Sequence, residues 1–209
     1  MNHNSPKEEL WSSLTHGFGF VLSIVGLLFL VLKGIQKESF THVIAGLVFG
    51  LSLGLCYFSS TAYHAVKKEK LKVYLRCLDH AAIYILIAGT YTPYLLFNVG
   101  QEARGLWLPI IWGFAAVGVV IKMFFTGKYE LLSTFAYLVM GWIGLIFIRD
   151  LVSSIPSGGL YLLIAGGLVY SLGAVVFLLD RLPYNHVIWH VFVLGGSICH
   201  YFSIFLYVA

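Results

Sequence analysis

Seven long apolar stretches follow one another along this 209-residue sequence, and they constrain its fold more than any other feature. A helix needs about 20 mostly apolar residues to cross a lipid bilayer, and each stretch reaches or approaches that length. The stretches are residues 15–32, 43–63, 78–97, 106–125, 131–148, 159–179 and 187–208. The fourth extends to residue 125 only if the ammonium group of Lys122 reaches the membrane surface. We therefore predict an all-α integral membrane protein, a bundle of seven transmembrane helices.

The composition supports a membrane protein and excludes other classes. Apolar residues make up 59% of the chain and charged residues only 11%, whereas soluble domains carry about 25% charged residues. The segments between the apolar stretches are short, so we predict that residues 1–209 form a single membrane domain. The net charge of +4 is modest and the basic residues lie in short loops, which argues against nucleic-acid binding. We expect a multi-pass protein of the plasma (cytoplasmic) membrane.

The basic residues predict the orientation of the bundle. Seven spans place the two termini on opposite sides of the membrane. The side of the N-terminus carries nine of the 13 basic residues: Lys7, Lys67, Lys68, Lys70, Lys72, Arg76, Lys122, Lys128 and Arg181. The other side carries four: Lys33, Lys37, Arg104 and Arg149. Because loops rich in Lys and Arg remain in the cytoplasm, we predict a cytoplasmic N-terminus and an external C-terminus.

A pair of histidines at the start of the last apolar stretch indicates a metal site. His186 and His190 are four residues apart, a spacing that places both imidazoles on one face of a helix. Ionisable side chains are costly inside a membrane and need a partner there, and a divalent metal bound by neutral imidazoles is one such partner. The predicted topology brings His64, at the end of the second stretch, to the same side of the membrane.

His64, His186 and His190 therefore form a predicted set of three metal ligands. Catalytic zinc commonly has three protein ligands and a fourth position for water or substrate, so we predict Zn²⁺. Asp79 begins the third stretch on the same side, where its carboxylate would contact the metal through a water or directly. Ser60 precedes His64 by one helical turn, and its hydroxyl would orient Asp79 or stabilise an oxyanion.

Each of these residues also has an interpretation without a functional site. In that case the histidine pair lies among lipid headgroups, Asp79 pairs with Arg76 three residues earlier, and Ser60 only bonds one helix to another.

The two other histidines near these stretches are not expected to join the site. We predict that His80 points away from Asp79. His200 lies ten residues beyond His190, about 15 Å farther along a helix. We therefore predict a packing role for His200 and no contact with the metal.

Short motifs along the chain occur in the order found in a known family. They comprise residues 9–12 leading to 15–17, then 60–64, 78–79, 89–93 and 186–190. Over essentially its whole length the sequence resembles the hemolysin III branch of the progestin and adipoQ receptor (PAQR) family, which is related to alkaline-ceramidase-like membrane hydrolases.

The resemblance implies seven helices, a cytoplasmic N-terminus and one zinc held by His64, His186 and His190. It also implies that Asp79 and Ser60 lie near the water on that zinc. The chain departs from the adiponectin-receptor relatives in having only about a dozen residues before its first apolar stretch. Its predicted external loops are short as well, so the resemblance does not extend to reception of a protein hormone.

Three functions are compatible with these features. The first is a zinc-dependent hydrolase that cleaves a lipid amide or ester, as ceramidases do, near the cytoplasmic leaflet, with a membrane lipid as substrate. The second is a membrane-homeostasis sensor or receptor-like protein in which zinc is structural and a lipid is the ligand. The third is a cytolysin of the hemolysin III type. A pore needs a polar face on several helices, whereas the fourth to sixth stretches are almost purely apolar. No motif indicates a protein partner or an oligomeric state.

Overall fold

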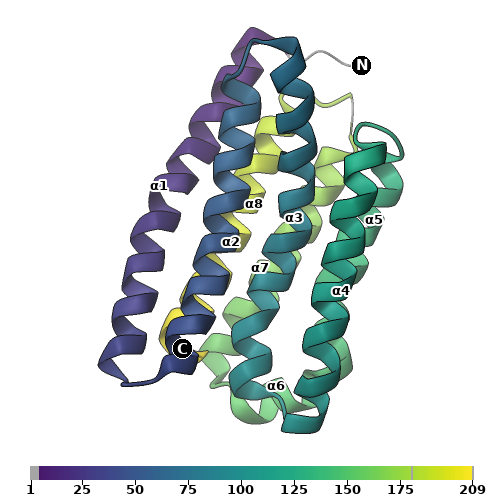
Figure 1. Cartoon of the computed structure of the whole chain (residues 1–209). Coiled ribbons are helices and arrows are strands. Elements are labelled where there is room, and N and C mark those ends of the chain that lie inside the picture. Colours follow the sequence, from purple (N-terminus) through teal and green to yellow (C-terminus); the bar gives the residue numbers. More distant parts are fainter. Residues whose placement is uncertain (1–4, 180, 209) are drawn as a thin grey trace.

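The computed structural model describes residues 5–179 and 181–208, and nearly all of them are helical. Seven helical segments run between the two ends of the described molecule, and an odd number of crossings leaves the two chain ends at opposite ends of the bundle (Figure 1). The segments are α1 (Pro6–Gln36), α2 (Phe40–Ala65), α3 (Glu69–Asn98), α4 (Gln101–Phe125), a broken segment of α5 (Glu130–Gly141), η1 (Ile143–Phe147) and α6 (Ile148–Ser154), then α7 (Ser157–Phe177), and α8 (Asn185–Ser203) with its π-helical end η2 (Ile204–Val208).

Six of the segments are long and apolar enough to cross a membrane, which confirms a multi-pass membrane protein. The exception is α3, which carries polar residues such as Asp79, Thr90 and Thr92 along its length. This helix packs against α2, α4, α5, α6 and η2, so protein surrounds it on several sides. Because polar side chains in membrane helices face the interior of the bundle, the position of α3 explains its lower hydropathy.

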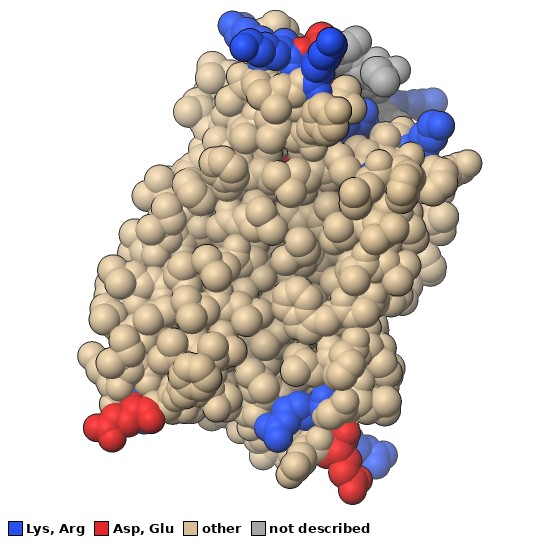
Figure 2. All heavy atoms as spheres, in the orientation of Figure 1, with Lys and Arg blue, Asp and Glu red and all other residues tan. Residues whose placement is uncertain are grey.

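The charged side chains lie at the two ends of the molecule. Figure 2 shows Lys and Arg gathered at the end where α1 begins, a broad band without charge on this face, and a few charges of both signs at the other end. Large apolar side chains such as Phe18, Leu28 and Phe124 are more than half exposed. An apolar band between two polar ends matches the cross-section of a bilayer.

The first helix begins earlier than the sequence analysis predicted. Ser5 forms a capping box with Glu8: the Ser5 hydroxyl accepts a hydrogen bond from the Glu8 amide, and the Ser5 amide donates to Glu8 Oε2 at 2.7 Å. Pro6 occupies the first helical position, where it needs no hydrogen-bond partner. As a consequence Glu9 and Ser12 lie within α1 rather than in a tail.

The fifth segment is not the continuous helix predicted over residues 131–148. α5 ends at Gly141, and a 3₁₀ turn, η1, separates it from α6. The Tyr91 hydroxyl of α3 fills the break, since it donates to the Gly141 carbonyl at 2.5 Å and accepts from the Gly144 amide at 2.9 Å. A side chain from another helix thus satisfies backbone groups that the break leaves unpaired.

The fourth helix reaches Phe125, but Lys122 does not extend to the surface as we had expected. Its side chain is buried, with 1% of the residue exposed. The Nζ atom donates to Ser133 Oγ at 2.7 Å and lies 5.8 Å from the centre of the Tyr137 ring. The neighbouring helix α5 therefore supplies polar and aromatic contacts that replace the membrane surface.

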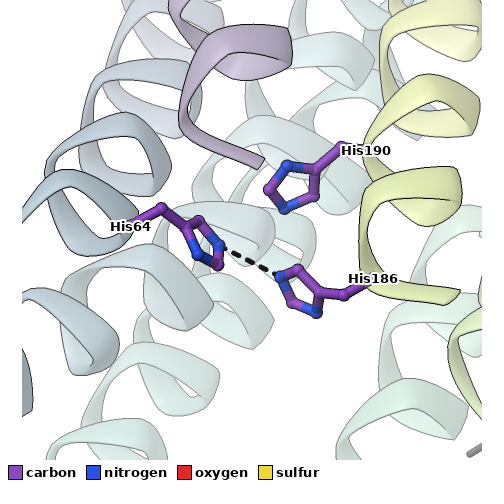
Figure 3. Close-up of side chains that lie close together, drawn as sticks. All are labelled: His64, His186 and His190. Atoms are coloured by element: carbon purple, nitrogen blue, oxygen red, sulfur yellow. Dashed lines mark hydrogen bonds between the residues drawn. The ribbon is translucent and has the colours of Figure 1, made fainter. Parts of the chain in front are cut away.

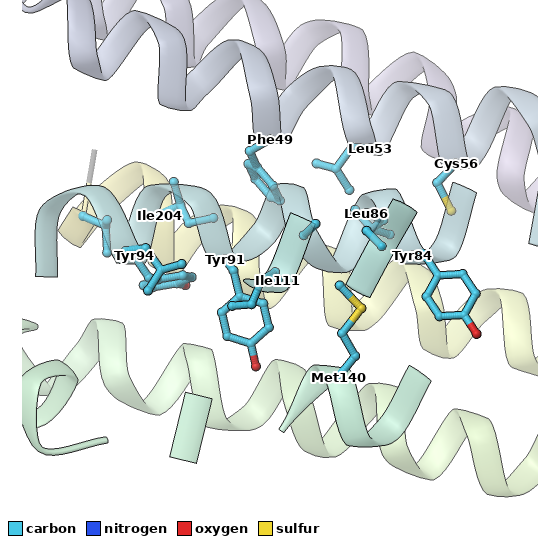
Figure 4. Close-up of a cluster of buried hydrophobic side chains, with 14 of the residues drawn as sticks. Phe49, Leu53, Cys56, Tyr84, Leu86, Tyr91, Tyr94, Ile111, Met140 and Ile204 are labelled. Atoms are coloured by element: carbon cyan, nitrogen blue, oxygen red, sulfur yellow. The ribbon is translucent and has the colours of Figure 1, made fainter. Parts of the chain in front are cut away.

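The core is built around α2 and α3. Figure 4 shows Phe49, Leu53 and Cys56 of α2 beside Leu86 and other side chains of α3, with Ile111 of α4 and Met140 of α5 completing the cluster. α8 packs against both α7 and α1, so the last helix lies next to the first. This arrangement brings the start of α8 to the N-terminal half of α1 and to the end of α2.

Candidate metal centre

Three histidines converge where α2 ends and α8 begins. His64 lies in the last turn of α2, and His186 and His190 lie on one face of α8 (Figure 3). Each offers a ring nitrogen, and the three nitrogens all lie within 4.8 Å of one another. The Nε2 atoms of His64 and His186 are 3.1 Å apart. The structure thus brings together the three ligands predicted from sequence, and they form a group that can hold a metal ion.

Glu9 of α1 orients the first of these imidazoles. Its Oε2 atom lies 2.9 Å from His64 Nδ1, and its Oε1 atom lies 3.1 Å from Lys72 Nζ. A carboxylate at this nitrogen fixes the proton on Nδ1 and leaves the Nε2 lone pair directed toward the other histidines. The outer contact between carboxylate and histidine is characteristic of metal-binding histidines.

The backbone of α1 orients His190 of α8. Its Nδ1 atom lies 3.1 Å from the carbonyl oxygen of Ser12 and 3.5 Å from Thr15 Oγ1. A carbonyl only accepts, so His190 Nδ1 carries the proton and donates it to Ser12, leaving Nε2 as the ligand atom. α1 therefore determines the tautomer of two of the three histidines, a feature that fits a metal site.

His16 packs directly on the site. Its ring stacks on that of His190 with the centroids 3.6 Å apart and the planes 11° from parallel. The residue is 3% exposed, and neither ring nitrogen has a hydrogen-bond partner among the described residues. The sequence analysis included His16 only within the motif of residues 15–17 and gave it no role. The spacing of Glu9, Ser12 and His16 matches one face of a helix. This spacing is the sequence feature that could have predicted the contribution of α1 to the histidine site.

Asp79 lies near the histidines but is not a member of the converging group. The residue is 8% exposed, and its Oδ2 atom is 3.6 Å from His80 Nδ1. His80 therefore points toward Asp79, contrary to our expectation. Arg76 does not pair with Asp79, because its guanidinium donates to Glu130 at 2.8 Å. The ion pair that competed with a functional role for Asp79 is absent from the described residues.

Ser60 and His200 occupy different environments. Ser60 is buried one turn before His64, and its hydroxyl has no hydrogen-bond partner among the described residues. His200 lies deep in α8, where Nε2 is 3.1 Å from the carbonyl oxygen of Leu163 and the ring packs on Tyr170. The packing role predicted for His200 is in agreement with these contacts.

A cavity of about 200 Å³ extends from this site into the bundle. At the site it is lined by His16, Asp79, His186 and His190. Toward the opposite end its walls are mainly apolar and include Leu151 and Leu163. His16, His186 and His190 therefore face a mainly hydrophobic space inside the bundle, which suits a ligand with a long apolar part.

Comparison with known proteins shows the family. The family model described as haemolysin-III related matches residues 4–201. The chain belongs to the haemolysin-III-related family. Among its haemolysin-III relatives, the Hemolysin-3 homolog of Bacillus subtilis (strain 168) is 42% identical over 96% of this chain and 94% of that protein. Hemolysin-3 of Bacillus cereus is also 42% identical, over 97% of this chain and 92% of that protein.

The family extends to animals. Monocyte to macrophage differentiation factor of Homo sapiens, a PAQR member, is 32% identical to this haemolysin-III-related chain, over 100% of it and 91% of the human protein. The resemblance inferred from the motifs is thus confirmed. The match covers α1 through α8, so it includes every element that contributes to the histidine site.

Proposed function

We propose that the protein is a zinc-dependent membrane hydrolase that cleaves a lipid amide or ester. The observation that most supports this proposal is the convergence of three buried or half-buried histidines at one end of an apolar cavity. α1 determines the tautomers of two of them. Nitrogen ligands in this number suit Zn²⁺ and leave a fourth position open. When bound there, zinc supplies a Lewis acid and lowers the pKa of a coordinated water to about 7.

Asp79 acts in this proposal as the general base. Its carboxylate lines the same cavity as His186 and His190, and it lies outside the group of converging nitrogens. That position favours contact through a water over direct ligation. Asp79 would accept the proton of the attacking water, and His80, 3.6 Å away, would stabilise the charged carboxylate.

The remaining residues position the reacting groups. Glu9 and the Ser12 carbonyl hold the imidazoles of His64 and His190. Within the part of the chain that the structure describes, the Ser60 hydroxyl has no hydrogen-bond partner. It is therefore available to orient Asp79 or to donate to the oxyanion that develops on the substrate carbonyl. The apolar cavity would hold the acyl chain beside the histidines and exclude bulk water.

The proposal also assigns an orientation. The end of the molecule that carries the site is the end rich in Lys and Arg (Figure 2), so by the positive-inside rule it faces the cytoplasm. The site would act on lipids of the cytoplasmic leaflet of the plasma membrane.

A structural metal is the second candidate. The site joins α1, α2 and α8 through Glu9, His64 and His190, and a metal there would hold the three helices together in a sensor of membrane state. A cytolytic activity, which the name Hemolysin-3 denotes for the Bacillus cereus relative, is the third candidate. It is the least favoured, since a pore needs a polar face on several helices, whereas α4 and α7 carry few polar residues between their ends.

Turnover of N-acyl lipids such as ceramides tests the hydrolase. The Asp79→Asn variant should retain bound zinc and lose roughly 10²- to 10⁴-fold in turnover, the usual contribution of a general base. The control variant Glu102→Gln removes an exposed carboxylate at the opposite end of the molecule, and it should leave turnover unchanged. If Asp79→Asn hydrolyses the lipid as fast as the wild type, Asp79 is not the base; if no such lipid is hydrolysed by the zinc-loaded wild type, the structural metal is favoured.

A further inference from the structure

The segment between α2 and α3 carries the densest group of basic residues in the chain. Lys67 and Lys68 precede α3, and Lys70 lies in its first turn. All three residues are exposed, and none forms an ion pair with another of the described residues. Glu69 is the single acidic residue among them, so residues 67–70 keep a net charge of +2. We refer to Lys67, Lys68 and Lys70 as the basic segment.

The next two basic residues of α3 already have partners inside the protein. Lys72 Nζ lies 3.1 Å from Glu9 Oε1, and the Arg76 guanidinium donates to Glu130 at 2.8 Å. Both basic residues are only partly exposed. The described part of the chain thus supplies carboxylates to Lys72 and Arg76 and not to the basic segment. The charge of the basic segment is therefore free to pair with an anion from outside the chain.

Three exposed apolar side chains continue from the basic segment along one face of α3. Leu71, Tyr74 and Leu78 are spaced as i, i+3 and i+7, which places them on one side of the helix. They are 44%, 75% and 37% exposed. Lys70 precedes Tyr74 by four residues, so it lies on the same side. We refer to Leu71, Tyr74 and Leu78 as the apolar stripe.

The basic segment and the apolar stripe lie where a membrane changes from water to hydrocarbon. The turn between α2 and α3 is at the end of the molecule where Lys and Arg gather, and the band without charge begins next to it (Figure 1, Figure 2). Lysines beside a membrane attract lipids with negatively charged headgroups, and the stripe offers an apolar surface to their acyl chains. A soluble acidic protein would match the lysines but not the stripe.

We propose that the start of α3 binds an anionic phospholipid, whose phosphate pairs with the basic segment and whose acyl chains lie along the apolar stripe. Neither the basic segment nor the stripe lines the cavity of the histidines. The inference therefore goes beyond the proposed hydrolase, and the binding step requires neither a metal nor turnover. The basic segment then holds a particular lipid in addition to setting the orientation of the bundle.

Native mass spectrometry of the purified full chain tests the proposal. The protein is titrated in detergent with dioleoylphosphatidylglycerol or with the zwitterionic dioleoylphosphatidylcholine, and the affinity for the first bound lipid is measured. Each lysine beside an anionic headgroup contributes roughly fivefold in binding. The wild type should therefore bind phosphatidylglycerol at least about tenfold more tightly than phosphatidylcholine. Equal affinities would overturn the proposal and leave an acidic partner protein as the occupant.

Variants of the basic segment locate the preference. Lys67→Gln/Lys68→Gln/Lys70→Gln should bind both lipids about equally, and the corresponding triple arginine variant should keep the preference. The matched control replaces three exposed basic residues at the same end of the molecule, in Lys7→Gln/Lys128→Gln/Arg181→Gln, and should keep it too. If the control loses as much preference as the glutamine variant, the overall charge of this end attracts the lipid, and the proposal is wrong.

Two further measurements test whether the ligand is a lipid and not a soluble phosphate. Leu71→Gln/Tyr74→Gln keeps the lysines and should lower the affinity for phosphatidylglycerol; an unchanged affinity would show that the chains do not lie along the stripe. Glycerol 3-phosphate carries the charge without the chains, so it should not displace the bound lipid at equal concentration. Displacement would identify a site for soluble phosphate and overturn the proposal. If the glutamine variant does not fold, the wild-type selectivity, the arginine variant and the displacement still decide the question.

Discussion

Glu9 connects α1 to the group of converging histidines. One carboxylate oxygen holds His64 and the other binds Lys72, so three segments meet at this side chain. The sequence resemblance included Glu9 in a motif without giving it a role. Its contacts depend on the course of α1, which starts at Pro6 and packs against both α2 and α8.

Glu9→Gln should weaken the metal site without unfolding the protein. The amide still accepts a hydrogen bond from His64, but it no longer raises the basicity of the imidazole, and loss of such an outer contact typically lowers metal affinity by about 10- to 100-fold. Competition with a zinc chelator measures the change. Glu102→Gln, far from the site, should retain wild-type affinity; equal affinities for both variants would show that Glu9 does not support the ligand.

The convergence of His64, His186 and His190 could be predicted from sequence because each lies near the end of an apolar stretch at the same end of the bundle. The contacts around them could not. Whether Lys122 reaches the surface or turns inward depends on Ser133 and Tyr137, which belong to another helix. The direction of His80 depends in the same way on the local turn of α3 beside Asp79.

The contact between α2 and α3 depends on a glycine. A Cβ atom at Gly89 would lie 2.2 Å from Ser52 Oγ and 2.6 Å from Ser52 Cβ, so only glycine permits this approach. α3 is thereby held against α2, which places Asp79 at the depth of His64. Close helix contact through small residues is a general feature of membrane bundles.

Gly89→Ala should therefore destabilise the protein by about 1–3 kcal/mol, the usual cost of overpacking. Gly113→Ala is the matched control, because Gly113 lies in α4 with open space around it; there alanine should be neutral or stabilising by up to about 1 kcal/mol. Chemical unfolding of the purified variants in detergent measures both. Equal stability of the two variants would contradict the packing described for α2 and α3.

The break in the fifth segment marks a limit of prediction from sequence. Residues 131–148 form an uninterrupted apolar stretch, and length and hydropathy alone predict one helix. Gly141 ends α5, and the Tyr91 hydroxyl from α3 satisfies the backbone groups of Gly141 and Gly144 at the break. Among the other helices, α2, α7 and α8 begin within three residues of the predicted starts, whereas α1 and α3 each begin nine residues earlier. Their first turns are polar, so apolar length alone does not include them.

The whole molecule has an uneven distribution of charge, with basic residues concentrated at the end that carries the histidines (Figure 2). Fusion of reporters to the two termini tests the orientation that this asymmetry predicts. Green fluorescent protein should fluoresce at the N-terminus, and alkaline phosphatase should be active at the C-terminus, since only a translocated phosphatase folds. The reverse pattern would place the site at the external leaflet and contradict the proposed access to cytoplasmic lipids.

Metal analysis of the purified protein tests the central claim most directly, because every function considered for the site depends on a bound ion. The wild type should carry about one zinc ion per chain, as expected for a three-histidine site with an open fourth position. His186→Ala/His190→Ala should carry none while it still elutes as a folded protein. A wild type without stoichiometric metal, or a double variant that keeps the full amount of zinc, would contradict the assignment of His64, His186 and His190 as the metal centre.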